Sequence, residues 1–392
     1  MTSQENTSDV TTKPAGNKPT ILFVSTRLGG GGAEKHLVRV ANALVDEFNI
    51  HIAVLRSGGS YEELVRDQIQ IHHVGPTWLN SWTLGSAWLG TGRLAGLITK
   101  IQPKCMVSFL EPASWATHFA RKKSGVGTPH LVAVQNNFSS AINSFRGMIK
   151  GQFRPGIEDA IRQADGIVAI SEGVAGDVVS HFPNLNRAKI TTIYNAAFEN
   201  PPVSVSPIER KDRRPHQLVA CGRLAEQKGF EDLLKAVQLT SRQIDVGLWI
   251  LGVGPLEKNF KDLVRDLGVE DRVSFVGFQD DPLPWFAGAD LFVLSSRWEG
   301  FGNVIVEAMS VSTAVVSTAC PHGPDEIIDH NVNGFLVPVS DTKKMAEGIV
   351  SVMSDPNLRQ QFATEGKKRS NDFSATLIAG QYANLISSYV DS

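Results

Sequence analysis

Cysteine is scarce in this sequence, with only Cys105, Cys221 and Cys320 among 392 residues. Three thiols so far apart exclude a disulfide framework and the paired spacing of a zinc site. Long hydrophobic runs are missing as well: no stretch of about 18 apolar residues occurs, which argues against a membrane-spanning helix. Residues 1–18 lack the apolar core of a secretory signal. We therefore expect a floppy N-terminal tail and a cytoplasmic protein.

Acidic residues are almost absent from one long stretch of the first half. Between Asp67 and Glu158 the single acidic residue is Glu111, against nine basic ones. Four of the seven tryptophans lie in the same stretch, together with several other large apolar residues: Trp78, Trp82, Trp88 and Trp115, with Phe138, Phe145, Met148 and Ile149. Basic residues beside exposed aromatics suit a lipid-phosphate ligand or an anionic lipid surface, such as the inner face of the cell membrane. A solvated basic face with its tryptophans in the core explains the composition equally well.

The chain is long enough for two domains of roughly 150–200 residues. Strand-like and helix-like runs alternate twice along it, which is typical of α/β lobes with a parallel sheet and helices on both faces. A stretch with four prolines and no periodicity, residues 199–215, separates the two series. The predicted organisation is a tail at 1–18, a Rossmann-like lobe at 19–198, a linker at 199–215, a second Rossmann-like lobe at 216–374 and a helix at 375–392 that packs back toward the first lobe.

Strands are expected in both lobes, and each is bounded by helical patterns. In the first lobe we expect them at Thr20–Ser25, Ile50–Leu55, Cys105–Leu110, His130–Val134, Gly166–Ile170 and Ile190–Tyr194. In the second lobe we expect them at Gln217–Cys221, Gly247–Leu251, Val273–Val276, Leu291–Ser295, Ala314–Thr318 and Phe335–Val337.

A glycine cluster, 29–32, follows the first expected strand. Glycines let a ligand approach the backbone, and the helix that follows offers unpaired amides to an anion. The dinucleotide fingerprint G-x-G-x-x-G fails, because Glu34 occupies the place of its third glycine. At the end of the second strand region, where NAD-binding proteins carry an acidic residue that binds the ribose, this chain has Arg56. An arginine there suits the 2′-phosphate of NADP, so an NADP-dependent two-domain oxidoreductase stays open as an alternative.

Two cations follow the first strand of the second lobe. Arg223 and Lys228 lie in the segment GRLAEQKGF, just past the carboxyl end of a parallel strand, where α/β sheets hold their ligands. Arginine offers a planar fork and lysine a point charge, so together they suit a diphosphate. Taken alone, the same two residues could also be solvated charges of a loop that binds no ligand.

Two carboxylates eight residues apart follow the strand at 291–295. Glu299 is expected in a loop, and Glu307 about two turns into the helix that comes next. Carboxylates accept hydrogen bonds from vicinal hydroxyls such as those of ribose or a hexose. The helix start between them offers unpaired amides to an anion.

Taken together, these segments resemble the retaining GT-B glycosyltransferases of glycosyltransferase family 4. The resemblance runs in family order over roughly residues 20–341. It rests on the glycine loop before Ala33-Glu34, DGIVAISE (165–172), Ile193–Asn195, GRLAEQKGF (222–230), the E-x7-E segment 299–307, CPHGPDEI (320–327) and NGFLVP (333–338). It implies an acceptor lobe first, a nucleotide-sugar donor lobe second and a ligand cleft between them.

The resemblance also implies roles for the charged residues. Arg223 and Lys228 correspond to the pair that grips the donor diphosphate. Glu307 corresponds to the ribose ligand, and Glu299 to the carboxylate at the sugar hydroxyls. The catalytic candidates are therefore Glu299, Arg223 and Lys228.

Main-chain groups complete the implied donor site. Backbone amides toward sugar or phosphate would come from Phe301, Gly302, Asn303 and Val304. Gly31 and Gly32 would bring the first-lobe backbone against the diphosphate. Phe278 corresponds to the place where the family usually holds the base.

One position departs from the family pattern. Many members carry a histidine near the sugar after the strand that corresponds to His130–Val134, but this chain has Gln135 and Asn136 there. Both amides are candidates for the acceptor side, and no general base is assigned. His118 precedes that strand and is not given the role.

The expected reaction is transfer of a hexose or N-acetylhexosamine from a nucleotide sugar, with a UDP-sugar as the expected donor, to a lipid-linked saccharide. Asp-x-Asp motifs and histidine clusters are missing, so we expect no metal and no cofactor. Nucleic acid is not an expected partner, since no helix-turn-helix, zinc-finger or RNP-like pattern occurs. A non-catalytic nucleotide-sugar binder, and a sugar-nucleotide epimerase or hydrolase, remain alternatives.

Overall fold

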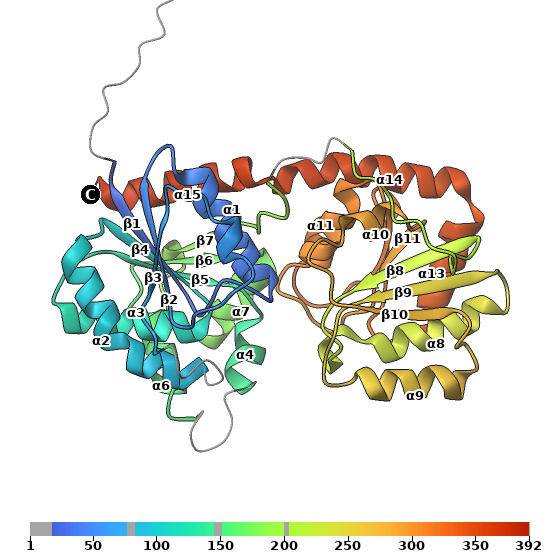
Figure 1. Cartoon of the computed structure of the whole chain (residues 1–392), viewed down its shortest axis with the longest axis horizontal. Coiled ribbons are helices and arrows are strands. Elements are labelled where there is room, and N and C mark those ends of the chain that lie inside the picture. Colours follow the sequence, from blue (N-terminus) through green and yellow to red (C-terminus); the bar gives the residue numbers. More distant parts are fainter. Residues whose placement is uncertain (1–17, 77–82, 145–150, 200–203, 392) are drawn as a thin grey trace, which may run out of the picture.

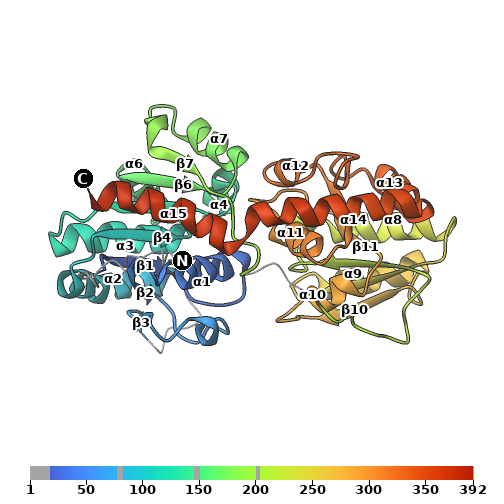
Figure 2. The same cartoon turned by 90° about the horizontal axis from the view of Figure 1, so that it is seen from above.

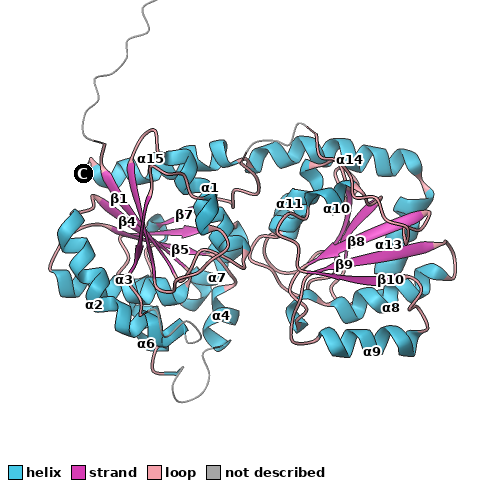
Figure 3. Ribbon diagram, viewed as in Figure 1, coloured by secondary structure: helices cyan, strands magenta, loops and turns pink. Residues whose placement is uncertain are grey.

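The structure is a computed structural model that describes residues 18–76, 83–144, 151–199 and 204–391. Two lobes lie side by side, and each is a parallel sheet with helices on both faces (Figures 1 and 3). This confirms the predicted fold class of two Rossmann-like lobes. Except for Lys18, the predicted tail lies outside the described residues, as do four residues of the predicted linker.

The first lobe is built on a seven-stranded sheet in the order β3-β2-β1-β4-β5-β6-β7. Its strands are β1 (Thr20–Ser25), β2 (Asn49–Val54), β3 (Gln70–His73), β4 (Cys105–Phe109), β5 (His130–Val134), β6 (Gly166–Ala169) and β7 (Ile190–Thr192). Its helices are α1 (Gly32–Leu44), α2 (Thr83–Ile101), α3 (Glu111–Ser124), α4 (Phe138–Ser144), α6 (Arg154–Arg162) and α7 (Glu172–His181). Strand β3 was not predicted from the sequence.

Strand β1 shows why this sheet is buried on both faces. Ile21 and Phe23 belong to a core cluster shared with α1 and the C-terminal helix α15 (Ala375–Val390), whereas Leu22 and Val24 belong to a cluster with α2 and α3. Alternate residues of a strand point to opposite faces, so a continuous apolar run is what two helix layers require. Each such side chain, fully buried, contributes about 1.5–3 kcal/mol.

The second lobe repeats the plan with six strands in the order β10-β9-β8-β11-β12-β13. These are β8 (His216–Cys221), β9 (Val246–Leu251), β10 (Val273–Gly277), β11 (Leu291–Leu294), β12 (Ala314–Thr318) and β13 (Phe335–Val337). Its helices are α8 (Phe230–Ser241), α9 (Glu257–Leu267), α10 (Leu283–Ala287), α11 (Asn303–Ser310), α12 (Pro324–Ile327), α13 (Thr342–Ser354) and α14 (Pro356–Ser370).

The chain passes between the lobes twice, and the two passages lie side by side. Phe198 and Ser374 form a parallel bridge. The amide of Ala197 donates to the carbonyl of Phe373, and that of Ala375 to the carbonyl of Phe198, both at 2.9 Å. Helices α14 and α15 then run one after the other across both lobes (Figures 1 and 2), and α15 packs against α1.

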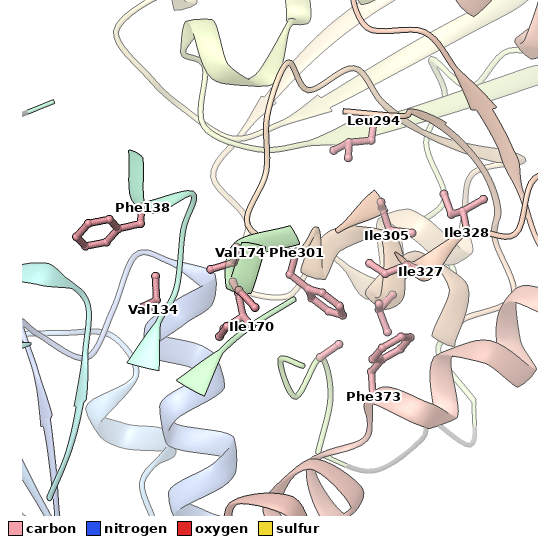
Figure 4. Close-up of a cluster of buried hydrophobic side chains, with 14 of the residues drawn as sticks. Val134, Phe138, Ile170, Val174, Leu294, Phe301, Ile305, Ile327, Ile328 and Phe373 are labelled. Atoms are coloured by element: carbon pink, nitrogen blue, oxygen red, sulfur yellow. The ribbon is translucent and has the colours of Figure 1, made fainter. Parts of the chain in front are cut away.

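A hydrophobic cluster joins the lobes beside the two passages (Figure 4). Ile170 and Val174 of the first lobe share it with Phe301 and Ile305 of the second. The ring of Phe301 packs against those of Tyr194 and Phe373, with ring centroids 5.5 and 5.2 Å away. The lobes are therefore held in contact by apolar burial next to the segments predicted to bind substrate.

Candidate active site

A cleft of about 740 Å³ lies between the lobes, at the carboxyl ends of strands from both sheets. In each sheet the strand order reverses at the first strand of the lobe, and such reversal points are where α/β sheets form ligand crevices. All thirteen residues assigned to donor or acceptor from the sequence line this cleft: Gly31, Gly32, Gln135, Asn136, Arg223, Lys228, Phe278, Glu299, Phe301, Gly302, Asn303, Val304 and Glu307. The structure brings them together, and their individual roles stay predictions.

Two helix N-termini from opposite lobes meet at the cleft. Gly31 precedes α1 and Gly302 precedes α11, and neither helix start has a side-chain cap among the described residues. A Cβ placed on Gly32 would lie 2.5 Å from Nδ2 of Asn303, so glycine permits this approach of the two lobes. The first-turn amides and the helix dipoles make the place favourable for an anion such as a diphosphate.

Gly302 needs its own backbone conformation to start α11. Its φ of 103° lies in a region that side-chain-bearing residues rarely adopt. The helix therefore begins at Asn303, and Glu307 lies just over one turn into it. The sequence-based placement of Glu307 two turns into the helix was wrong, because the glycine delays the helix start.

Lys228 and Glu299 form an ion pair inside the cleft. Lys228 ends a short 3-10 turn after β8, and its Nζ donates to Oε1 of Glu299 at 2.6 Å. The hydroxyl of Ser296 donates to the same oxygen at 2.6 Å. Glu299 is buried, so a counter-charge and a hydroxyl are what stabilise its carboxylate there. A ligand that reached Lys228 would have Glu299 as its neighbour.

Arg223 differs from Lys228 in having no side-chain partner in the part of the chain that the structure describes. It is exposed at the edge of the cleft, and no hydrogen bond or ion pair of its side chain is found among the described residues. An unpaired guanidinium in a cleft offers a planar pair of donors to an incoming phosphate.

Glu307 is buried and faces cations from the first lobe. Its Oε1 lies 3.5 Å from Arg39 and 3.7 Å from Lys35, both on α1. The sequence analysis missed these two residues. Their spacing of four along a helix that starts at the glycine loop is the signal that could have found them.

Buried amide groups face the cleft without partners. Gln135 at the end of β5 is 4% exposed, and neither polar atom of its side chain has a hydrogen-bond partner among the described residues. The Oδ1 atoms of Asn195 and Asn303 are in the same situation, and both residues line the cleft. Leaving a buried polar group unpaired costs about 1–3 kcal/mol, so a hydroxyl-rich ligand would gain by pairing with these amides. Asn195 was not among the predicted site residues.

Aromatic residues contribute to the site in two ways. Phe278 is half exposed and lines the cleft just after β10, where a planar ring has room to stack. Phe301 is buried in the cluster between the lobes, so only its main chain is available to a ligand.

Other residues weighed from the sequence lie outside the site. Arg56 and His118 are not among the residues that line the cleft. Burial lowers the pKa of His118. Within the described ranges, no group of three or more His, Cys, Asp or Glu side chains could hold a metal ion. No described helix combines the length and apolarity needed to cross a membrane.

The basic, aromatic stretch of the first lobe is only partly a surface feature. Phe138 is fully buried, so it belongs to the core and not to an exposed aromatic surface. Trp115 is half-buried and packs at a tilted angle against Phe119 and Phe153. Trp88 is 64% exposed on α2. The remaining members of the set, Trp78, Trp82, Phe145, Met148 and Ile149, lie outside the described residues.

Comparisons with known proteins agree with this geometry. The family model described as Glycosyl transferases group 1 matches residues 205–369, and that described as Glycosyltransferase Family 4 matches residues 30–197. The chain is a GT-B glycosyltransferase. The first lobe of the transferase is thus similar to Glycosyltransferase Family 4 and the second lobe to Glycosyl transferases group 1, and the oxidoreductase alternative finds no support.

Two curated relatives match nearly the whole transferase. One is the Campylobacter jejuni N-acetylgalactosamine-N,N'-diacetylbacillosaminyl-diphospho-undecaprenol 4-alpha-N-acetylgalactosaminyltransferase, 27% identical, covering 90% of this chain and 95% of its own. The other is the Rhizobium meliloti lipopolysaccharide core biosynthesis glycosyltransferase LpsE, 28% identical, covering 91% and 96%.

Solved structures share the fold of the transferase. Anabaena HepE in complex with UDP and glucose has a TM-score of 0.75 at 21% identity, covering 94% of this chain and 99% of its own. Sucrose-phosphate synthase from Thermosynechococcus elongatus has a TM-score of 0.77 at 18% identity, covering 95% and 99%.

Proposed function

We propose that this transferase moves a hexose or N-acetylhexosamine from a UDP-sugar to a hydroxyl of a lipid-linked saccharide, with retention and without a metal. The observation that carries the proposal is the meeting of Arg223, Lys228, Glu299 and Glu307 in one cleft, beside the N-termini of α1 and α11. Cations and free amides suit a diphosphate, and carboxylates suit the hydroxyls on either side of it.

The chemistry follows from these charges. As the bond between the anomeric carbon and the phosphate oxygen breaks, negative charge gathers on the leaving diphosphate. Arg223, Lys228 and the helix amides are already in place to stabilise it, which lowers the barrier without reorganisation. The acceptor oxygen then bonds to the anomeric carbon, its proton leaves for solvent or the departing phosphate, and the nucleoside diphosphate is released.

The donor orientation follows from the pair of Lys228 and Glu299. With the diphosphate on Lys228, the sugar hydroxyls come within reach of Glu299 and the unpaired amide of Gln135. The ribose then falls toward Glu307, and the base toward the exposed ring of Phe278. Cations take the charge-neutralising role that a divalent metal has in other transferases.

The acceptor class is supported by the relatives. The name of the Campylobacter relative describes a diphospho-undecaprenol saccharide acceptor, and that of the Rhizobium relative a lipopolysaccharide core. For this chain we propose a saccharide carried on a lipid phosphate, reached from the cytoplasmic face of the membrane.

A direct assay tests the proposal. The full-length protein is incubated with UDP-glucose, UDP-galactose and their N-acetylated counterparts, one at a time, together with a polyprenyl-diphosphate saccharide. Mass spectrometry is expected to show an acceptor heavier by one sugar residue, and the anomeric proton coupling of the product to show retention. UDP binding with no product would support a non-catalytic binder, and donor breakdown or a changed donor sugar without acceptor would support a hydrolase or an epimerase. Loss of transfer with a chelator would contradict metal independence.

A further inference from the structure

Two cationic side chains of helix α1 reach across the junction between the lobes. Helices α1 and α11 face each other there (Figures 1 and 2). Lys35 and Arg39 lie four residues apart, on one face of α1. Both reach the carboxylate of Glu307 on α11, at 3.7 and 3.5 Å. The acceptor lobe therefore contacts the donor-lobe residue that we assign to the ribose.

Arg39 is itself fixed at its other end. Its Nη1 donates to the carbonyl of Ala196 at 3.0 Å, in the segment that leads out of the first lobe. The amide of Ala196 in turn donates to Nδ1 of His36 at 2.9 Å. With one nitrogen on Ala196, the guanidinium has a defined position from which Nη2 reaches Glu307.

The contacts on Glu307 are one-sided. Lys35 and Arg39 both meet Oε1, and Oε2 has no partner among the described residues. A carboxylate has about four acceptor positions, so Oε2 keeps its capacity for ligand hydroxyls. The side chains of Glu307 and Arg39 are only 8% and 10% exposed, so water competes little with their interaction.

We infer that Arg39, assisted by Lys35, is a positioning residue that aims the Glu307 carboxylate at the ribose hydroxyls of the donor. This inference rests on the proposed function, and it adds that the acceptor lobe takes part in donor recognition. Without Arg39, Glu307 would be a buried carboxylate without its nearest counter-charge, and it would be free to turn away from the ribose.

The test is a ratio of affinities. Calorimetric titration of the full-length protein with UDP and with 2′-deoxy-UDP measures how much the ribose hydroxyl contributes. A hydrogen bond to a charged group predicts that the wild type binds UDP at least about 10-fold more tightly than 2′-deoxy-UDP. We expect Glu307→Gln and Arg39→Gln each to bring the two affinities within about threefold, and the double variant to lower the ratio no further. Arg39→Lys is expected to restore part of it.

A merely structural role would not move this ratio. Loss of folded protein lowers the amount that binds UDP and 2′-deoxy-UDP alike. Lys258→Gln, an exposed site on α9 outside the cleft, is the charge-matched control and is expected to keep the ratio. If Arg39→Gln does not fold, Lys35→Gln carries the test, because Lys35 is more exposed and is expected to lower the ratio as well.

The two possible failures look different. Wild-type ratios in Arg39→Gln and Lys35→Gln, with a lost ratio in Glu307→Gln, would overturn the positioning role and leave the proposed function intact. Absence of UDP binding in the wild type, or a wild-type ratio in Glu307→Gln, would overturn the donor site itself and the inference with it.

Discussion

Among the cations of the cleft, Lys228 has the surroundings that most clearly support a role in catalysis. It lies 2.6 Å from a buried glutamate and lines the cleft between the lobes. Lys228→Ala is expected to lower turnover by roughly 10²–10³, the loss typical of removing one preorganised electrostatic donor. Steady-state kinetics of the variant measures this, with Lys258→Ala as a control for loss of a lysine. Near-normal transfer by a folded Lys228→Ala protein would contradict the assignment.

Gln135 offers a test in which stability and activity move in opposite directions. Its amide is buried without partners among the described residues, so Gln135→Met removes a desolvation cost while it keeps the shape. We expect the urea midpoint to rise, with a free energy of unfolding higher by about 1 kcal/mol. The kcat/KM for the donor is expected to fall by roughly 3- to 10-fold, because the hydrogen bonds to the substrate are lost. Denaturation curves and kinetics together measure both effects.

The control for Gln135 is an exposed amide. Gln163→Met, at the end of α6 and outside the cleft, is expected to change neither quantity. Unchanged kinetics in Gln135→Met would mean that this amide does not meet the substrate.

Residues of the site differ in how well a sequence reveals them. Arg223, Lys228, Glu299 and Glu307 could be predicted because charges directly after parallel strands meet at one sheet edge, and because their spacing matches a known family. The ion pair between Arg39 and Glu307 could not be predicted, since the two residues lie on different lobes. Contacts across two lobes depend on how the lobes pack, which no local pattern encodes.

The strands that could be predicted from the sequence are those with a largely apolar composition. Every strand expected from the sequence is present, with ends shifted by at most two residues. Strand β3 was missed because Gln70–His73 holds one aliphatic residue among a glutamine and two histidines. It is an edge strand of the sheet and is only partly covered, so it does not need the continuous apolar run of a central strand.

Helix α1 carries a buried histidine that makes the stability of the first lobe depend on pH. Nδ1 of His36 accepts from the amide of Ala196 at 2.9 Å, and Nε2 lies 3.2 Å from the hydroxyl of Tyr382 on α15. With Nδ1 already an acceptor, the neutral ring carries its proton on Nε2. Burial lowers the pKa of His36 to about 3, and burial likewise lowers the pKa of His130 on β5 to about 3.

The consequence is a loss of stability on mild acidification. Between pH 6.5 and pH 3 the unfolded histidines bind protons that the folded ones do not, so the free energy of unfolding falls as the pH falls. Each of the two histidines contributes a decrease of roughly 1.4 kcal/mol per pH unit below its unfolded pKa. Urea midpoints from pH 7.5 to pH 5 measure the slope. His36→Gln is expected to reduce it, and an unchanged slope would contradict the role of His36.

At the scale of the whole molecule, the two-lobe plan could be predicted from the alternation of apolar strands and amphipathic helices. The arrangement of the lobes could not. It depends on Phe301, whose ring packs against Tyr194 and Phe373, and on the paired passages at Phe198 and Ser374. The cleft exists because apolar packing on one side holds the lobes together while the glycine loop keeps their backbones close on the other.

The first lobe also presents a surface suited to its proposed acceptor. On α2, Trp88 and Leu89 are 64% and 41% exposed, and the exposed Arg93 lies one turn further along. Lys122 and Lys123 end α3 next to them, since a Cβ on Gly92 would lie 3.5 Å from Nζ of Lys123. Aromatic and aliphatic side chains among basic ones suit the headgroup region of an anionic bilayer.

Binding to such a bilayer is therefore expected to need both kinds of side chain. Each basic residue contributes about 1 kcal/mol near an anionic surface, so Arg93→Gln with Lys123→Gln lowers partitioning by roughly 30-fold at low salt. Trp88→Ser is expected to weaken binding at any salt concentration, because its contribution is apolar. Co-sedimentation with phosphatidylglycerol vesicles, compared with phosphatidylcholine vesicles, measures both. The control is Lys258→Gln with Lys343→Gln on the second lobe, which also removes two positive charges and is expected to leave binding unchanged. Equal sedimentation with both lipids would remove the membrane from the function of this surface.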